Sequence, residues 1–213
     1  GLCREQRGRP VVGFIVCGWN FENGPFDLWP RDDSDYEKFA ESIELISEKL
    51  GCRVCLMSHS NGFDIPPAPF ELKHGRDYPI SKQLQSVIER RGIAKNVVCL
   101  DGVYDAWQTK AIIGSFDMLV SGRVHAAVAG LSQSVPTVII DYGHEPKAHK
   151  LRGFATVAGV TEYVADPSDG KDLDVKIEAC WSKRDEIKSF LDEHIPEVCA
   201  LARENFQRLR DVI

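Results

Sequence analysis

The chain has 213 residues, a formal net charge of −6 and a hydrophobic fraction of 43%. This length allows one large domain or two small ones, and the apolar fraction is typical of a globular protein with a full core. The negative charge argues against a general nucleic-acid-binding protein, because such proteins are normally basic. No apolar run approaches the roughly 20 residues that cross a bilayer, and residues 1–7 are polar and basic without the apolar core of a signal peptide. We therefore expect a soluble cytoplasmic chain without a transmembrane segment.

The predicted secondary structure alternates between strands and helices. Short apolar runs predict buried strands, and apolar residues at intervals of three and four predict helices with one buried face. A segment rich in Gly, Pro, Asn and Asp at 58–79 is expected to be a long loop. In chain order we expect a strand at 11–17, a helix at 35–50, a strand at 53–57, the long loop, a helix at 80–91, a strand at 96–100, a short helix at 107–115, a strand at 118–120, a helix after residue 123, a strand from residue 135 and a short strand at 163–164.

The C-terminal part is predicted to be a helical tail over about 182–213. Apolar residues at helical spacing predict helices at 171–181 and 185–191. Pro196 is expected to begin a last helix, because proline is favoured in the first helical turn. No interior linker is visible, so we interpret residues 1–213 as a single domain.

This alternation predicts an α/β fold with a doubly wound, mostly parallel sheet of about six strands, of the Rossmann-like type. The strand at 118–120 is expected to be central because it is apolar throughout. Ligands of such sheets bind beyond the carboxyl ends of the strands, where the loops after residues 17, 57, 100, 120 and 140 converge. No G-x-G-x-x-G follows the first strand, so a dinucleotide site of the usual kind is not expected.

Seven cysteines are present, and two of them, Cys52 and Cys55, form a C-x-x-C. Such a pair is compatible with redox or metal chemistry. The segment around it is predicted to be a strand, however, and no second pair has zinc spacing. We therefore expect reduced, mostly buried thiols.

The most informative segment surrounds the strand at 118–120. The strand ends at Ser121 and Gly122, and Arg123 and His125 follow where a helix begins. Backbone N–H groups at a helix start lack partners within the helix, and the helix dipole is positive there. Together with an Arg and a His they form a site for a phosphate or a carboxylate. The same residues are also compatible with an ordinary helix start that carries a surface Arg and a packed His.

Residues 121–127 resemble a short element of the polysaccharide pyruvyl transferase family: a serine, any residue, an arginine, an aliphatic residue, a histidine and a small residue. Family members carry a Tyr and a Lys after this element, which correspond to Tyr142 and Lys147, although the loop between them is longer here. They often also carry a histidine at the place of His59, followed by an aspartate, for which Asp77 is the candidate. The strong part of the resemblance spans roughly residues 97–160.

The resemblance implies an enzyme that moves the enolpyruvyl carbons of phosphoenolpyruvate onto two hydroxyls of a sugar. The product is a cyclic pyruvate ketal on a polysaccharide or on its lipid-linked oligosaccharide precursor. The family's fold is similar to the glycosyltransferase B arrangement, in which two Rossmann-like halves enclose a cleft. This chain then corresponds to the C-terminal, donor-binding half, with an N-terminal domain as its missing partner and little activity expected of the half alone.

The resemblance also implies roles for individual residues. Arg123 and His125 are the candidate catalytic residues, with Arg123 binding the donor's anionic groups and His125 acting either as general acid or as a phosphate ligand. The other candidate substrate-binding residues are Ser121, Gly122, Tyr142, Lys147 and His59. No metal and no cofactor are implied apart from phosphoenolpyruvate as the donor substrate.

Two other interpretations remain open. The first is one half of a glycosyltransferase or of a sugar-nucleotide epimerase with similar architecture, because these enzymes also bind donor phosphates at helix starts. The second is a binding module that keeps the anion pocket without catalysis.

Overall fold

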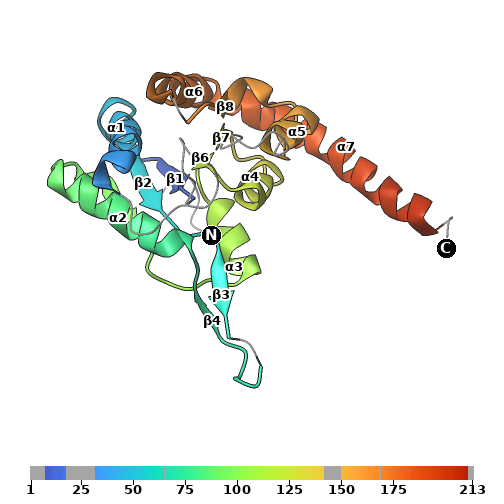
Figure 1. Ribbon diagram of the computed structural model, residues 1–213. Helices are drawn as coiled ribbons and strands as arrows, with labels where there is room; N and C mark the ends of the chain where they lie inside the picture. Colours follow the sequence, from blue (N-terminus) through green and yellow to red (C-terminus); the bar gives the residue numbers. More distant parts are fainter. Residues whose placement is uncertain (1–7, 18–31, 65, 142–149, 168, 211–213) are drawn as a thin grey trace.

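A computed structural model describes residues 8–17, 32–64, 66–141, 150–167 and 169–210, with only the backbone at 206 and 209. Its main feature is a six-stranded sheet with the strand order β5-β2-β1-β6-β7-β8 (Figure 1). Every neighbouring pair of strands in it is parallel. This order is that of a doubly wound Rossmann-type sheet, so the predicted fold class is confirmed. The strands are β1 (Val11–Ile15), β2 (Arg53–Leu56), β5 (Val97–Cys99), β6 (Met118–Ser121), β7 (Thr137–Ile140) and β8 (Val164–Ala165).

Strand β6 lies in the middle of the sheet, between β1 and β7. In the register, Met118 is opposite Val12 of β1, and Leu119 is opposite Thr137 of β7. All four residues of β6 are buried. The continuous apolar run that predicted a central strand is thus explained by helices covering both faces of the sheet.

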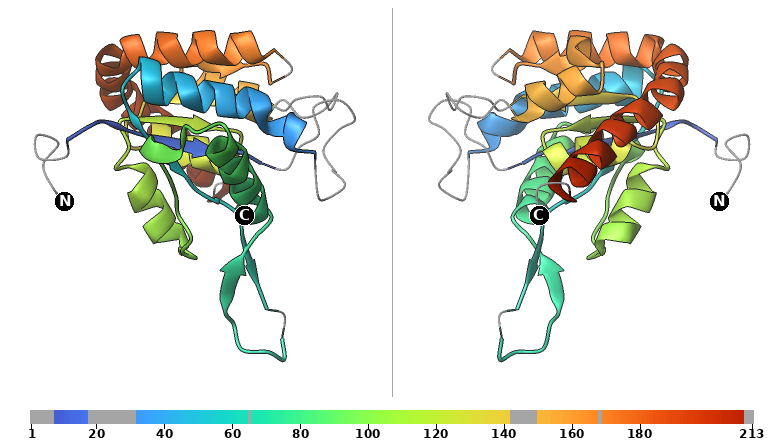
Figure 2. Two further views of the ribbon diagram at one scale, coloured as in Figure 1. Left: turned by 90° about the vertical axis from the view of Figure 1, so that its left-hand side faces the viewer. Right: turned by 90° about the vertical axis from the view of Figure 1, so that its right-hand side faces the viewer.

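The helices form one layer on each face of the sheet. Helix α1 packs against α2 and α6, while α4 packs against α3 and α5. Figure 2 shows α1 and α6 on one side of the sheet and α3 on the other. The helices are α1 (Glu37–Glu44), α2 (Asp77–Arg90), α3 (Ala106–Ile113), α4 (Val124–Leu131), α5 (Lys150–Val157), α6 (Gly170–Ser182) and α7 (Arg184–Arg210). Helix α1 is preceded by a 3-10 turn (Asp33–Tyr36) and continued by a π-helical turn (Leu45–Lys49), and further 3-10 turns lie at Ala94–Asn96 and Thr161–Tyr163.

Alternate strand residues face opposite layers, as the period of a β-strand requires. Phe14 of β1 points to the larger apolar cluster, where its ring meets that of Phe39 of α1 edge to face. The next residue, Ile15, belongs to the smaller cluster with Leu119 of β6 and Ile113 of α3. The core therefore lies on both faces of the sheet and leaves its carboxyl edge as the place for a site.

The prediction that residues 58–79 form a long loop is wrong. This segment contains an antiparallel hairpin, β3 (Asn61–Phe63) and β4 (Leu72–His74), which projects away from the sheet (Figure 1). Helix α2 also begins earlier than predicted, at Asp77 instead of residue 80. The hairpin strands have only three residues each and none of them is buried, so they lack the apolar alternation by which a sequence reveals a strand.

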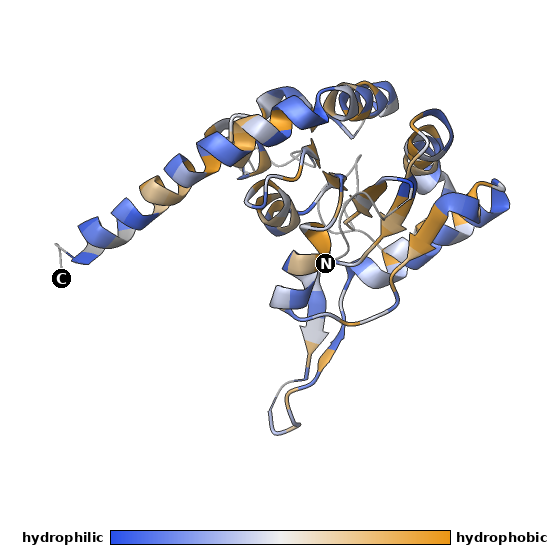
Figure 3. Ribbon diagram, turned by 180° about the vertical axis from the view of Figure 1, so that it is seen from behind, coloured by the Kyte–Doolittle hydropathy of each residue, from blue (hydrophilic) through white to orange (hydrophobic). Residues whose placement is uncertain are grey.

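The expected start of a last helix at Pro196 is also wrong, because α7 runs through Pro196 without a break. Proline removes one backbone donor from a helix. Pro196 is exposed, and so is Asp192, the residue four positions earlier whose carbonyl loses that donor. Figure 3 shows α7 extending away from the sheet, and the residues along its ribbon are largely hydrophilic. None of the helices in the described part of the chain combines the length and the apolar character that crossing a bilayer requires.

Candidate functional site

Strand β6 turns into helix α4 at the carboxyl edge of the sheet. Arg123 is the N-cap residue of α4, with an extended backbone, and His125 is the second residue of the helix. The hydroxyl of Ser121 accepts a hydrogen bond from the N–H of Arg123 at 3.0 Å and donates one to its carbonyl at 3.2 Å. The sequence predicts that Arg123 and His125 lie where a helix starts at this edge, and this is the position observed.

The guanidinium of Arg123 is paired with the carboxylate of Asp77. Its Nε lies 3.2 Å from Oδ1 and 3.0 Å from Oδ2, and a terminal nitrogen also donates to Oδ1. The side chain of Asp77 is fully buried, whereas that of Arg123 is 28% exposed. Two-point pairing of this kind fixes the orientation of a guanidinium as well as its position.

Asp77 joins three segments at this point. Its Oδ2 accepts a hydrogen bond from the N–H of Ser60 at 3.1 Å, and its own N–H donates to the hydroxyl of Ser60 at 3.3 Å. The segment after β2, the start of α2 and the start of α4 are therefore linked through one buried carboxylate. The sequence singled out Asp77 only as an aspartate following His59, and its pairing with Arg123 was not predicted.

His59 and His125 come from different segments and lie close together. Their rings are nearly parallel, with an angle of 3° between the planes and 6.5 Å between the centroids. His59 is half-buried after β2, and His125 is exposed on α4. The sequence predicted both residues at one edge, because loops converge beyond the carboxyl ends of parallel strands. In the structure both residues line one pocket.

The pKa of His59 is lowered from its ordinary value of 6.5, first of all by burial, which disfavours the charged ring. The neighbouring His125 and Arg123 lower it further, while the carboxylate of Asp77 acts in the opposite direction. His59 is therefore a neutral imidazole at neutral pH. A neutral imidazole can accept a proton.

Acidification should destabilise the protein partly through His59. Because the folded-state pKa lies below the unfolded value of 6.5, the unfolded chain binds this proton more tightly, and stability falls as the pH drops through 6.5 towards the folded-state pKa. Replacing His59→Gln should make the loss between about pH 7.5 and pH 5 smaller. Urea denaturation of both proteins at each pH measures this, and an equal loss in the variant contradicts it.

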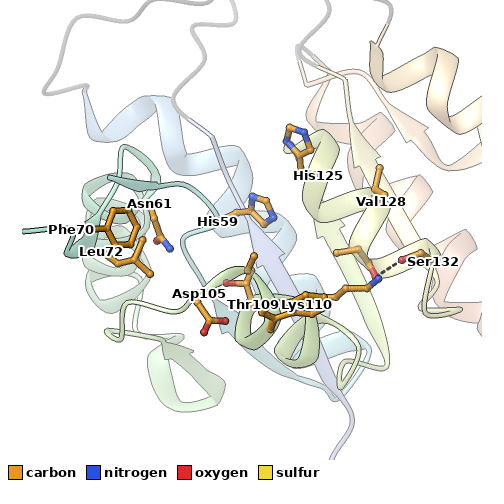
Figure 4. A pocket seen from close by; sticks show the side chains of 13 residues that line it. His59, Asn61, Phe70, Leu72, Asp105, Thr109, Lys110, His125, Val128 and Ser132 are labelled. Carbon is orange, nitrogen blue, oxygen red and sulfur yellow. Dashed lines mark hydrogen bonds between the residues drawn. The ribbon is translucent and has the colours of Figure 1, made fainter. Parts of the chain in front are cut away.

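The two histidines line a hollow of about 680 Å³. Figure 4 shows side chains of the hairpin on one side, those of α4 on the other, those of α3 below, and His59 between them. The hairpin contributes Asn61, Phe70 and Leu72, α3 and its N-cap contribute Asp105, Ala106, Trp107, Thr109 and Lys110, and α4 contributes Val128, Ala129 and Ser132 besides His125. The aromatic part of this lining was not predicted, because Trp107 was noted only as the beginning of a short helix.

The carboxyl end of β7 contributes Asp141, whose side chain is nearly buried. Its Oδ2 forms an ion pair with Nε of Arg152 in α5, and its Oδ1 has no hydrogen-bond partner within the described ranges. Tyr142 and Lys147, which the sequence selected as substrate-binding residues, lie outside the described residues.

Cys52 and Cys55 do not form a redox pair. Both are free and buried, and burial raises the pKa of Cys52 to about 11 and that of Cys55 to about 12. Reactive thiols have lowered pKa values, so these two behave as apolar core residues, as expected.

Comparison with known proteins finds the family described as polysaccharide pyruvyl transferase, whose model matches residues 31–144, more than half of the chain. The match includes Asp77 and the segment from Ser121 to His125. No curated protein matches the chain.

Several solved structures share the fold. An O-GlcNAc transferase variant from Thermobaculum terrenum is 14% identical with a TM-score of 0.60, and the match covers 90% of this chain but 32% of that one. The catalytic domain of cholesterol-alpha-glucosyltransferase from Helicobacter pylori is 13% identical with a TM-score of 0.56 and coverage of 91% and 99%. The C-terminal domain of a group 1 glycosyl transferase from Francisella tularensis is 11% identical with a TM-score of 0.55 and coverage of 90% and 85%. At these identities the likeness concerns the fold.

Proposed function

The chain belongs to the polysaccharide pyruvyl transferase family, and on this basis we propose that it is the donor-binding half of an enzyme that transfers pyruvyl from phosphoenolpyruvate to two hydroxyls of a sugar. One observation carries the proposal: the family's arginine and histidine, Arg123 and His125, lie at the start of α4, and His125 shares a pocket with a second histidine, His59. The acceptor is a polysaccharide or a lipid-linked oligosaccharide, and the enzyme acts in the cytoplasm during exopolysaccharide biosynthesis. An N-terminal domain completes the cleft.

The start of α4 suits the anionic groups of phosphoenolpyruvate. The helix dipole and the first N–H groups of a helix favour a phosphate or a carboxylate. Arg123 adds a charge that persists at every physiological pH, and the buried carboxylate of Asp77 holds its guanidinium beside the helix start. Lys147 is proposed as a further cation for the phosphate, and Ser121, Gly122 and Tyr142 as further contacts of the donor.

The reaction needs three proton transfers. The methylene carbon of phosphoenolpyruvate takes up a proton, so that the neighbouring carbon gains oxocarbenium character, and a sugar hydroxyl attacks that carbon and loses its own proton. A second hydroxyl then displaces inorganic phosphate, which takes up the proton of that hydroxyl, and the ketal closes. We assign the first proton to His125, because an imidazole can donate a proton near neutral pH and this one is exposed in the pocket. We assign the acceptance of a hydroxyl proton to His59, because burial lowers the pKa of its ring and keeps the ring neutral.

Thermal unfolding of the chain with different donors tests the proposal. Phosphoenolpyruvate at ten times its Kd should stabilise the chain by about 1.4 kcal/mol, which corresponds to about 3–5 °C in Tm for a protein of this size. UDP-glucose should have no effect, and inorganic phosphate serves as the control for a non-specific anion.

Two outcomes would overturn the assignment. A shift with UDP-glucose and none with phosphoenolpyruvate indicates a glycosyltransferase or epimerase half instead. Equal shifts with phosphoenolpyruvate and inorganic phosphate at equal concentrations indicate an anion-binding module without donor specificity.

A further inference from the structure

The lining of the hollow includes two large aromatic side chains that the protein leaves in solvent. The side chain of Trp107 in the first turn of α3 is 83% exposed, and that of Phe70 in the hairpin is 74% exposed. Both line the same hollow as His59 and His125. Aromatic side chains that are exposed together around a hollow are typical of a binding surface. Their exposure to solvent contributes nothing to the stability of the fold.

Groups that form hydrogen bonds alternate with these aromatic rings, and the fold holds two of them in place. The carboxylate of Asp105 caps α3 by accepting from the N–H of Gln108 at 2.8 Å. The amide of Asn61 donates to the carbonyl of Tyr104 at 2.5 Å, which ties the hairpin to the segment before α3. Both side chains therefore reach the hollow from anchored positions.

Lys110 adds a positive charge one helical turn after Trp107. It is exposed, and its ammonium makes no ion pair or hydrogen bond with any residue in the described ranges. The hollow thus offers an acceptor, a donor and a cation around exposed aromatic faces.

This combination of side chains suits the binding of a sugar. A pyranose ring has an apolar face of C–H groups, which packs on an aromatic ring, and a rim of hydroxyls, which bind carboxylate, amide and ammonium groups.

We propose that this hollow binds the saccharide chain of the acceptor, with Trp107 as the surface on which a sugar ring stacks. The identity of the occupant as acceptor rests on the proposed function. His59 and His125 line the same hollow as Trp107. A sugar that stacks on Trp107 therefore shares the hollow with the two histidines to which we assign the proton transfers. Acceptor recognition is therefore shared by this half of the enzyme and does not belong to the N-terminal half alone.

Binding of a neutral oligosaccharide to the chain without phosphoenolpyruvate tests this inference. Cellotetraose, maltotetraose and a β-galactose-containing tetrasaccharide are titrated into isotope-labelled chain, and the indole N–H signal of Trp107 is followed by NMR. We expect at least one of these probes to shift that signal with saturation. Trp107→Ala should weaken the binding of the same probe at least about fivefold, the scale of one aromatic contact.

Phe190→Ala is the matched control. Phe190 is a half-exposed aromatic residue, 43% exposed on α7, and it is not part of the lining, so its replacement should leave oligosaccharide affinity unchanged. If no probe shifts the Trp107 signal, or if Trp107→Ala binds the probe as well as the unchanged chain does, the inference is overturned, and a contact with the N-terminal domain is then the better explanation of the exposed rings.

The outcome is separable from that of the proposed function. If the chain binds an oligosaccharide but does not respond to phosphoenolpyruvate, the saccharide site is supported and the proposed pyruvyl donor is contradicted. If the chain responds specifically to phosphoenolpyruvate but binds no oligosaccharide, the donor site is supported and the saccharide site is contradicted.

Discussion

Replacing His125 by alanine is expected to lower the kcat of pyruvyl transfer by at least about 100-fold, the lower limit of what a positioned general acid contributes. The measurement uses the enzyme with its N-terminal half and follows inorganic phosphate release with a sugar acceptor. The fold should be unaffected, because His125 is exposed on α4. Circular dichroism and thermal unfolding of the variant check this point.

The distribution of the loss between kcat and KM separates the two roles that the sequence leaves open for His125. A general acid acts in the transition state, so its loss lowers kcat and leaves the KM for phosphoenolpyruvate nearly unchanged. A phosphate ligand also binds the ground state, so its loss raises that KM. His74→Ala is the control, since His74 is an exposed histidine of the hairpin outside the lining. If His125→Ala retains more than about a tenth of the activity, well above the range for a general acid, His125 is not the proton donor.

Arg123→Ala is expected to lower the free energy of unfolding by about 3 kcal/mol, because it leaves the carboxylate of Asp77 buried without its counter-ion. The side chain of Asp77 has no exposed surface, and both of its carboxylate oxygens accept hydrogen bonds from the guanidinium of Arg123. Urea denaturation at pH 7 measures the loss. Adding Asp77→Asn to the variant should recover part of it, because the neutral amide costs less to bury.

Arg91→Ala is the matched control for Arg123→Ala. Arg91 is 29% exposed, close to the 28% of Arg123, and it also pairs with carboxylates, Glu37 at 2.7 Å and Glu44 at 2.8 Å. Those carboxylates are 45% and 43% exposed, so water replaces the lost partner, and the expected cost is below about 1 kcal/mol. Equal losses in the two variants would show that the burial of Asp77 does not matter.

This stability effect bears on the interpretation of binding data. Donor binding to Arg123→Ala has to be measured at a temperature at which the variant is folded. Under that condition a remaining loss of affinity for phosphoenolpyruvate of about 1.5–3 kcal/mol is the scale of a charged hydrogen bond to the donor.

The sheet and the edge at which the candidate residues meet could be predicted because they depend on local patterns and on one general rule. Continuous apolar runs such as residues 118–120 indicate strands that are covered on both faces. The strand ends then had to meet at one edge. His59 and His125, which lie far apart in the sequence, were placed together by that rule, and their rings are 6.5 Å apart.

The details that were missed depend on contacts that no local pattern records. Arg123 and Asp77 are 46 residues apart, and nothing near either residue reveals the other as its partner. The hairpin strands are too short and too exposed to show alternation. Helix α7 continues through Pro196 because exposed backbone groups can bind water, whereas the sequence rule treats proline as a boundary.

The central pairing of β1 with β6 also has a consequence for how the protein folds. The carboxylate of Asp117 accepts a hydrogen bond from the N–H of Val11, 106 residues earlier in the chain, and the two strands then run side by side. Joining segments so far apart costs chain entropy before any contact rewards it. The pairing of β1 with β6 is therefore expected to form late in refolding, after the local helices have formed. A donor that binds at the carboxyl edge of this sheet needs the completed sheet, so it should slow unfolding without accelerating the early steps of folding.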